Sequence, residues 1–105
     1  MRPLTACIAA TCVFALATSA KADTNEFCTN VGELARVIMT KRQADFPMST
    51  LMQSIDGVDE ATRPLARLLI IMAYQKPDFS VEENQQEAVA EFRNQAELSC
   101  YQNKR

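Results

Sequence analysis

Cys28 and Cys100 are the two cysteines that lie outside the first 22 residues of this 105-residue chain. Two cysteines allow one intramolecular pairing, which here would join positions 72 residues apart. A crosslink that closes so long a loop restricts the unfolded chain and stabilises the folded one by about 4 kcal/mol. We therefore predict a Cys28–Cys100 disulfide; the alternative is two buried free thiols.

The first 22 residues predict the oxidising compartment that such a bridge needs. Arg2 precedes an uncharged, mostly apolar run, Leu4–Ala17, and Ala20 and Ala22 occupy the minus-three and minus-one positions of an A-x-A cleavage site. The run is shorter than the ~20 apolar residues of a membrane span. We predict a signal peptide cleaved after Ala22, a periplasmic or secreted location, and no stable membrane insertion of the mature chain.

Cleavage at this site leaves residues 23–105 as a single domain, because removing 22 of 105 residues leaves 83. Arg2 and Lys21 leave with the signal, so nine basic residues face 13 acidic ones, a formal charge of −4. This balance argues against nucleic acid and against an anionic membrane surface as partners. Cleavage after Ala20 and lipidation at Cys7 are alternatives, although the apolar stretch follows Cys7 instead of preceding it.

Hydrophobic periodicity predicts an all-α domain without repeats or linkers. The expected helices cover residues 24–44, 49–56, 62–75 and 81–101. Expected end signals are a cap at Asp23 or Thr24, the break at Pro47, a left-handed stop at Gly57, and a Ser80/Glu83 capping box with a Phe79 staple.

The cysteines and the short connections together predict the topology. Cys28 lies in the first turn of the first helix and Cys100 in the last turn of the fourth, so a bridge between them requires antiparallel helices. The third helix is apolar on more than one face, which is typical of a central helix with several neighbours. We predict a compact antiparallel bundle of three long helices and one short helix, closed by the disulfide between the first and last helices.

The residue types argue against an enzyme. The sequence contains no histidine, which excludes Ser-His-Asp, Cys-His and H-E-x-x-H sites, and it contains no glycine-rich phosphate loop. The nearest carboxylate cluster, Asp56, Asp59 and Glu60, fits the start of a helix better than catalysis. The methionines are better explained as core residues than as copper ligands. We expect no cofactor, no metal and no catalytic residue.

Five residues form a candidate partner-binding corner. The segment TKRQADFP places two cations, an amide and an aromatic ring at one helix end, and Tyr74 resembles it as a half-buried ring close to Pro77. Alternatively, these residues have only a structural role: the basic residues stabilise the last turn of the helix, and the Phe46 ring packs inward. The candidates are Lys41, Arg42, Gln43, Phe46 and Tyr74.

Cys28, the segments ELARVIMTKRQ and AYQKPDFS, and the final EFRNQAELSCY carry a resemblance to the small exported two-cysteine helical proteins of proteobacteria and their phages. The resemblance implies a bacterial, periplasmic protein and no particular activity. In architecture the chain is also similar to HdeA-type acid-stress chaperones, which implies binding of unfolded clients at low pH.

These observations lead to a ranked set of functions. We expect a non-enzymatic binding protein that contacts another protein, whose identity the sequence does not indicate. The alternatives are a periplasmic chaperone that exposes its core when acid neutralises its carboxylates, and an inhibitor or immunity protein of an exported enzyme.

Overall fold

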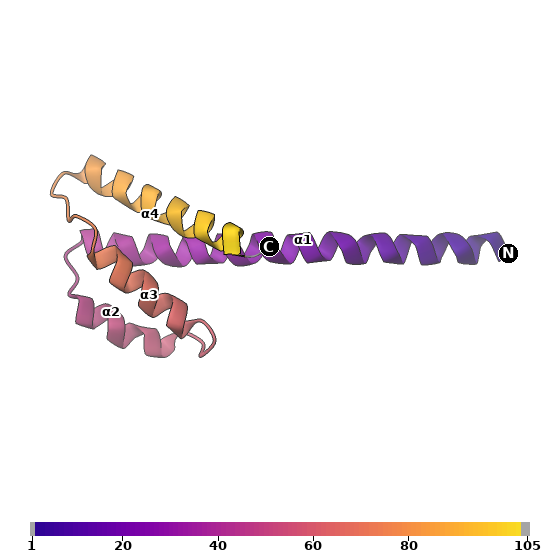
Figure 1. Cartoon of the computed structure of the whole chain (residues 1–105), viewed down its shortest axis with the longest axis horizontal. Coiled ribbons are helices and arrows are strands. Elements are labelled where there is room, and N and C mark those ends of the chain that lie inside the picture. Colours follow the sequence, from indigo (N-terminus) through magenta and orange to yellow (C-terminus); the bar gives the residue numbers. More distant parts are fainter. Residues whose placement is uncertain (1, 104–105) are drawn as a thin grey trace.

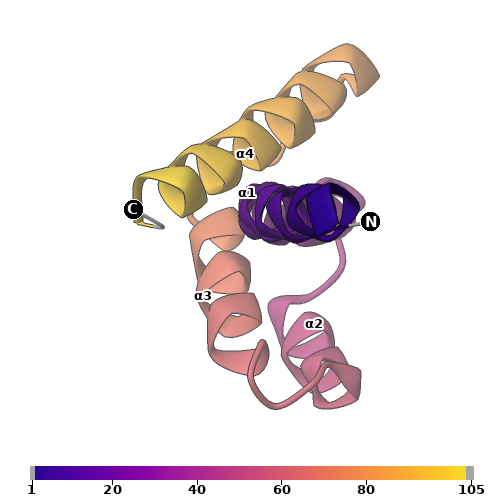
Figure 2. The same cartoon turned by 90° about the vertical axis from the view of Figure 1, so that its right-hand side faces the viewer.

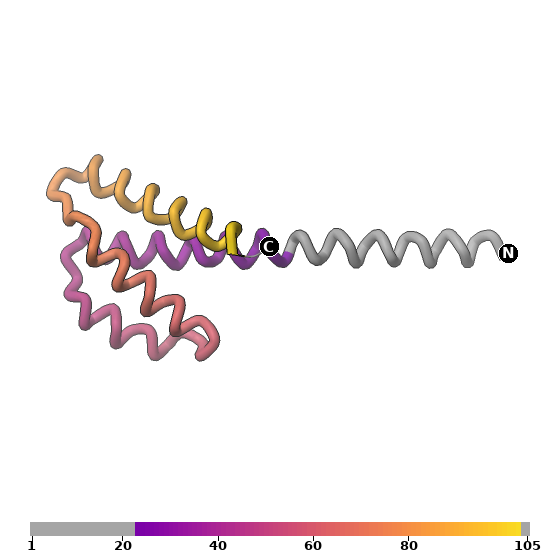
Figure 3. Tube along the Cα trace, in the orientation of Figure 1, coloured from indigo at the N-terminus to yellow at the C-terminus, as the bar shows by residue number. Residues whose placement is uncertain are grey.

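The computed structural model describes residues 23–103, and statements on side chains, packing and contacts concern these residues (Figure 3). The helices are α1 (Arg2–Gln43), α2 (Met48–Ser54), the 3-10 helix η1 (Ile55–Gly57), α3 (Arg63–Tyr74) and α4 (Glu82–Asn103) (Figure 1). Residues 23–103 contain no strand, so the all-α prediction is confirmed. The predicted signal peptide, its cleavage site after Ala22 and the lipidation alternative at Cys7 lie outside the described residues.

The core lies where α3 and α4 pack against α1. Viewed along α1, α4 lies on one side of this helix, and α2 and α3 lie on the other (Figure 2). The buried apolar cluster is Val31, Ala35, Ile38, Met39, Leu51, Ile55, Ala66, Leu69, Ile70, Ala73, Phe92 and Ala96.

The predicted disulfide is confirmed. Cys28 of α1 and Cys100 of α4 are bonded, with their Cα atoms 5.5 Å apart, and the Cys28 side chain is fully buried. Fifteen residues further along α1, the carbonyl of Gln43 accepts a hydrogen bond from Gln85, which lies 15 residues before Cys100. The first and last helices therefore contact each other along about 22 Å of helix, at a rise of 1.5 Å per residue.

Gly32 lies on the side of α1 that faces α4, between these two contacts. A Cβ atom at this position would come within 2.4–2.7 Å of three side-chain atoms of Glu97. Glu97 forms an ion pair with Arg93, one turn earlier on α4, at 3.0 Å. Glycine therefore leaves room for the Glu97 side chain, which a larger residue would displace.

Helix α1 differs from its prediction at both ends. The structure continues α1 through Asp23 and Thr24, so no cap starts the helix there in this chain. The helix ends before the predicted break at Pro47 because Asp45 adopts a left-handed conformation, with φ of 65°. The Phe46 N–H donates to the carbonyl of Lys41 and the Asp45 N–H to that of Arg42, both at 3.1 Å, which is a Schellman motif.

The other helix ends also correct two predictions. Gly57 is not left-handed; the chain leaves η1 through a tight turn in which the Val58 N–H donates to the carbonyl of Ile55. The Ser80/Glu83 capping box does not form. The amide of Gln85 instead donates to the carbonyl of Phe79 at 2.6 Å, and this bond orders the start of α4.

Candidate functional site

The five candidate residues come together where α1 and α3 end, next to the chain that leads into α4. We call this region the polar junction; it consists of Lys41, Arg42, Gln43, Phe46 and Tyr74. Lys41, Arg42, Gln43 and Phe46 were predicted together because they are close in the sequence. Tyr74 was added because it is also an aromatic ring close to a proline. The structure places Tyr74 against Phe46, although 28 residues separate them.

Gln43 is the centre of the polar junction. Only 4% of this residue is exposed. Its amide donates to the carbonyl of Pro77, and its side-chain oxygen accepts from the Phe79 N–H, both at 2.9 Å. One glutamine therefore satisfies a donor and an acceptor of the α3–α4 connection, and its side chain is not available to a partner.

Arg42 and Tyr74 bind to each other and to the backbone. The Arg42 guanidinium lies 4.9 Å from the centre of the Tyr74 ring, donates to the carbonyl of Lys76 at 3.0 Å, and approaches Asp78 at 3.9 Å. The Tyr74 hydroxyl donates to the carbonyl of Phe46. Burial raises the pKa of this phenol, which keeps it a donor at neutral pH.

Lys41 and Phe46 are the members of the polar junction with the most exposed positions. The Lys41 ammonium lies 4.8 Å from the centre of the Phe46 ring, and 38% of Phe46 is exposed. Arg42, Gln43 and Tyr74 thus hold elements together. The predicted contact with a partner stays a prediction, and within this group it rests on Lys41 and Phe46.

Two carboxyl groups meet at the edge of the polar junction. A side-chain hydrogen bond with Asp45 raises the pKa of Asp78; partial desolvation and the negative charge of Asp45 act in the same direction, and Arg42 opposes them. The folded chain therefore holds a proton on Asp78 more tightly than the unfolded chain does. This contact stabilises the fold most below the unfolded pKa, about 4, and its contribution is lost as the pH rises through the folded pKa.

We expect Asp78→Asn to change the pH dependence of stability in a defined direction. The amide keeps a hydrogen-bonding group next to Asp45 without the second negative charge, so the melting temperature should rise at pH 7 relative to the wild type. The gain should shrink towards about pH 4, where the wild-type carboxyl is itself protonated. Thermal unfolding followed by circular dichroism at several pH values measures this. Asp56→Asn, a charge removal at an exposed position, is the control; the same pH profile in both variants would contradict the prediction.

Outside the polar junction, apolar surface is left uncovered on the side of α3 that faces α4. The sequence predicted α3 as a central helix, but its partners in the fold are α1, α2 and η1, and α3 and α4 diverge from α1 (Figure 2). Apolar side chains line the space between them. Leu68 on this side is 52% exposed, and Phe27 of α1, which borders the same space, is 45% exposed.

We call this space the α3–α4 groove, and it consists of two hollows that share Gln95. The hollow at the disulfide end, about 270 Å³, is lined by Phe27, Val31, Leu65, Leu68, Leu69, Met72, Gln95, Ala96, Ser99, Cys100 and Asn103. The hollow at the opposite end, about 230 Å³, is lined by Met39, Lys76, Pro77, Phe79, Ala88, Glu91, Phe92 and Gln95.

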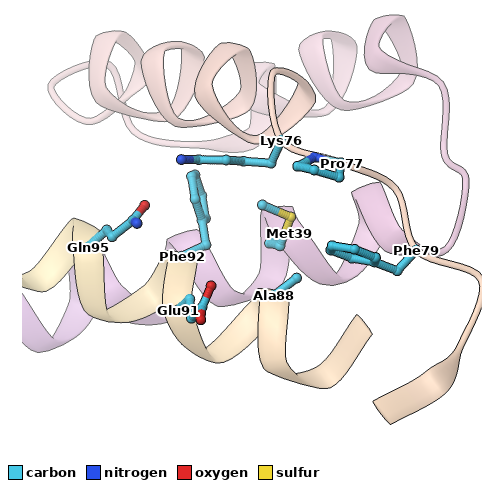
Figure 4. Close-up of a pocket in the computed structure, with 8 residues that line it drawn as sticks. All are labelled: Met39, Lys76, Pro77, Phe79, Ala88, Glu91, Phe92 and Gln95. Carbon is cyan, nitrogen blue, oxygen red and sulfur yellow. The ribbon is translucent and has the colours of Figure 1, made fainter. Parts of the chain in front are cut away.

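The second hollow combines an apolar floor with a few polar groups (Figure 4). Lys76 extends over the Phe92 ring towards Gln95, and Met39 and Phe79 lie farther along the hollow. Among the described carboxylates, none forms an ion pair with Lys76. The groove therefore offers apolar surface with a cation, Lys76, and a carboxylate, Glu91, in the same hollow, an arrangement that suits recognition.

The sequence indicated the apolar character of α3 but not the groove. Leu65, Leu68 and Met72 read as core residues, since a helix with several apolar faces normally has several neighbours. That α4 packs on α1 and leaves this face open depends on long-range geometry. Within the described part of the chain no group of three or more Cys, Asp or Glu side chains is placed to hold a metal ion.

Comparisons with known proteins match no family model, no curated protein and no solved structure. Among the described residues, no helix combines the length and the apolar character needed to cross a membrane.

Proposed function

We propose that this chain is a small exported, non-enzymatic binding protein that holds a partner protein in the α3–α4 groove. The uncovered apolar side of α3 carries the proposal. In a domain of this size, core-type side chains such as Leu68 contribute most to stability when covered, so leaving them exposed has a cost that binding would offset.

The shape of the groove supports a helical partner. Its lining on α4 runs from Ala88 to Asn103, about 22 Å of helix at 1.5 Å per residue. An amphipathic helix of that length lays its apolar face into such a groove, as in other helix-in-groove complexes. Lys76 at one end favours a partner with an acidic side chain at the corresponding position.

The proposal includes the cellular and architectural context predicted from the sequence. We propose that the mature domain begins after Ala22, is periplasmic or secreted, and is an antiparallel bundle with three longer helices and one short one. Support comes from the confirmed disulfide, which suits an oxidising compartment. It also comes from the Gln43–Gln85 contact, which pairs the end of α1 with the start of α4.

Leu68→Glu should weaken partner binding by about tenfold or more, because a charge buried against an apolar partner costs more than about 1.4 kcal/mol. The partner would first be isolated from a periplasmic extract with wild-type protein and identified. Its dissociation constant would then be measured for each variant by calorimetric titration.

Leu98→Glu is the matched control. Leu98 is 58% exposed on α4 and is not part of the groove lining, so the same substitution at similar exposure tests the groove itself. Both variants should unfold at temperatures close to that of the wild type. Equal affinities of the two variants would refute the groove as the binding site. Protection of many unrelated clients in acid alone, with no stoichiometric partner, would favour the chaperone alternative.

A further inference from the structure

We propose a second, independent site: the cavity between α1 and α2 binds the free anion of a long-chain carboxylic acid, with its carboxylate at Lys41. The cavity has a volume of about 340 Å³, within the range of small-molecule sites. Side chains of α1, α2, η1 and α3 enclose it. Its apolar walls include Leu34, Val37, Ile38, Leu51, Ile55 and Ile70.

The lining of this cavity is apolar except for one cation and two hydroxyl residues. Lys41 is the charged residue in the lining, next to Phe46 at the end of α1. The two hydroxyl residues in the lining are Thr50 and Ser54, and the Ser54 hydroxyl donates to the carbonyl of Leu51. No described carboxylate forms an ion pair with Lys41. Lys41 contacts the Phe46 ring but has no ion-pair partner among the described residues, and such a cation beside an apolar cavity is complementary to an anion with an apolar tail.

A second hollow next to this cavity offers space for the alkyl tail of the ligand. It has a volume of about 470 Å³, shares Leu34 and Val58 with the first cavity, and extends along α1 to Phe27. From Lys41 to Phe27 the path follows 14 residues of α1, about 21 Å. The far hollow adds the apolar side chains of Phe27, Val31 and Leu65, and Asn30, Asp59 and Thr62 also line it, so an alkyl tail would follow its apolar side.

Charge sets the orientation of the ligand. The far hollow is bordered by Asp59, whose carboxylate accepts hydrogen bonds from the N–H and the hydroxyl of Thr62. A second carboxylate at that end would be repelled, whereas Lys41 attracts it at the other end. The head group thus belongs at Lys41 and the tail towards Phe27.

This site does not depend on the proposed protein-binding function. The cavity opens between α1 and α2, whereas the α3–α4 groove lies on the other side of α3 (Figure 2). The head-group end of this site and the groove use different side chains of α3, with Ile70 lining the cavity and Leu68 the groove. The far hollow shares Leu65 of α3 and Phe27 and Val31 of α1 with the groove, so the tail end of the ligand would lie next to a bound protein.

The test is calorimetric titration of full-length mature protein with dodecanoate, decanoate and octanoate, each below its micelle-forming concentration. We expect one saturable site, with affinity rising about tenfold or more for each added pair of methylene groups. Lys41→Met should weaken dodecanoate binding about tenfold and leave binding of neutral dodecyl maltoside unchanged. Arg67→Met, which removes an exposed cation that lines neither cavity, should leave dodecanoate binding unchanged.

Amide chemical shifts recorded with dodecanoate locate the site. We expect changes at Leu34, Val58 and Ile70 and none at Gln95 in the α3–α4 groove. Absence of saturable binding, equal affinity of the wild type and Lys41→Met, or no dependence on chain length would overturn the proposal. Binding to phosphatidylglycerol vesicles without binding of free dodecanoate would also overturn it, because it would indicate a lipid surface as the ligand.

Discussion

Replacement of Cys28 and Cys100 by alanine should lower the free energy of unfolding by about 4 kcal/mol, the largest effect expected in this domain. The bridge closes a loop of 72 residues, so its loss restores conformational freedom mainly to the unfolded chain. For a small domain with a net stability of about 5 kcal/mol, the variant would keep about 1 kcal/mol, so about one sixth of its molecules should be unfolded at 37 °C.

Urea unfolding of oxidised protein, reduced protein and the double variant measures this effect. The oxidised protein should have a much higher transition midpoint than the other two, and the two unbridged forms should agree closely. The single variants Cys28→Ala and Cys100→Ala each leave one free thiol. They serve as controls for the effect of that thiol on stability, which matters because Cys28 is fully buried. A difference below about 1 kcal/mol between oxidised and reduced protein would show that packing alone holds α1 and α4 together.

Gln43→Ala should destabilise the fold by about 3 kcal/mol, although it removes no charge and little apolar surface. The substitution leaves the carbonyl of Pro77 and the N–H of Phe79 without their partners in a partly buried setting. Each such unsatisfied group costs about 1–3 kcal/mol. Urea unfolding of the disulfide-intact variant measures the loss.

Gln43→Met separates hydrogen bonding from packing. Methionine keeps nearly the same volume but offers neither the donor nor a strong acceptor, so the loss should be close to that of Gln43→Ala. Gln53→Ala, at an exposed position of α2, should change stability by less than about 0.5 kcal/mol. If Gln43→Met is as stable as the wild type, the polar junction contributes through shape and not through hydrogen bonds.

The sequence predicted the features that depend on local signals. Helical periodicity found α2, α3, α4 and the end of α1 to within a few residues, although α1 begins far before the predicted residue 24. The cysteine count, together with the predicted signal peptide, led to the disulfide. The ends of the helices were predicted less well. The left-handed residue is Asp45, whereas a left-handed stop was predicted at Gly57, and a side chain from α4, Gln85, replaces the predicted capping box at Ser80.

The role of Gln43 and the α3–α4 groove depend on long-range geometry, which explains why the sequence did not predict them. Gln43 was predicted as a candidate for contact with a partner, but its hydrogen bonds to a segment more than 30 residues away make it a structural residue. Leu68 looks like a core residue and is half exposed. Both differences arise because the relative placement of α3 and α4 is set by packing on α1, which periodicity within one helix does not encode.

The disulfide also determines how the molecule would respond to mechanical load. The chain enters and leaves the covalent loop at Cys28 and Cys100, whose Cα atoms are 5.5 Å apart. Tension applied through the segments on either side of the pair would pass across the sulfur atoms and bypass α2, α3 and most of the core. Stretching such a molecule would extend only the chain outside the loop. The parts of the α3–α4 groove and of the α1–α2 cavity that lie within residues 28–100 would keep their shape under a pull that unfolds an unbridged domain.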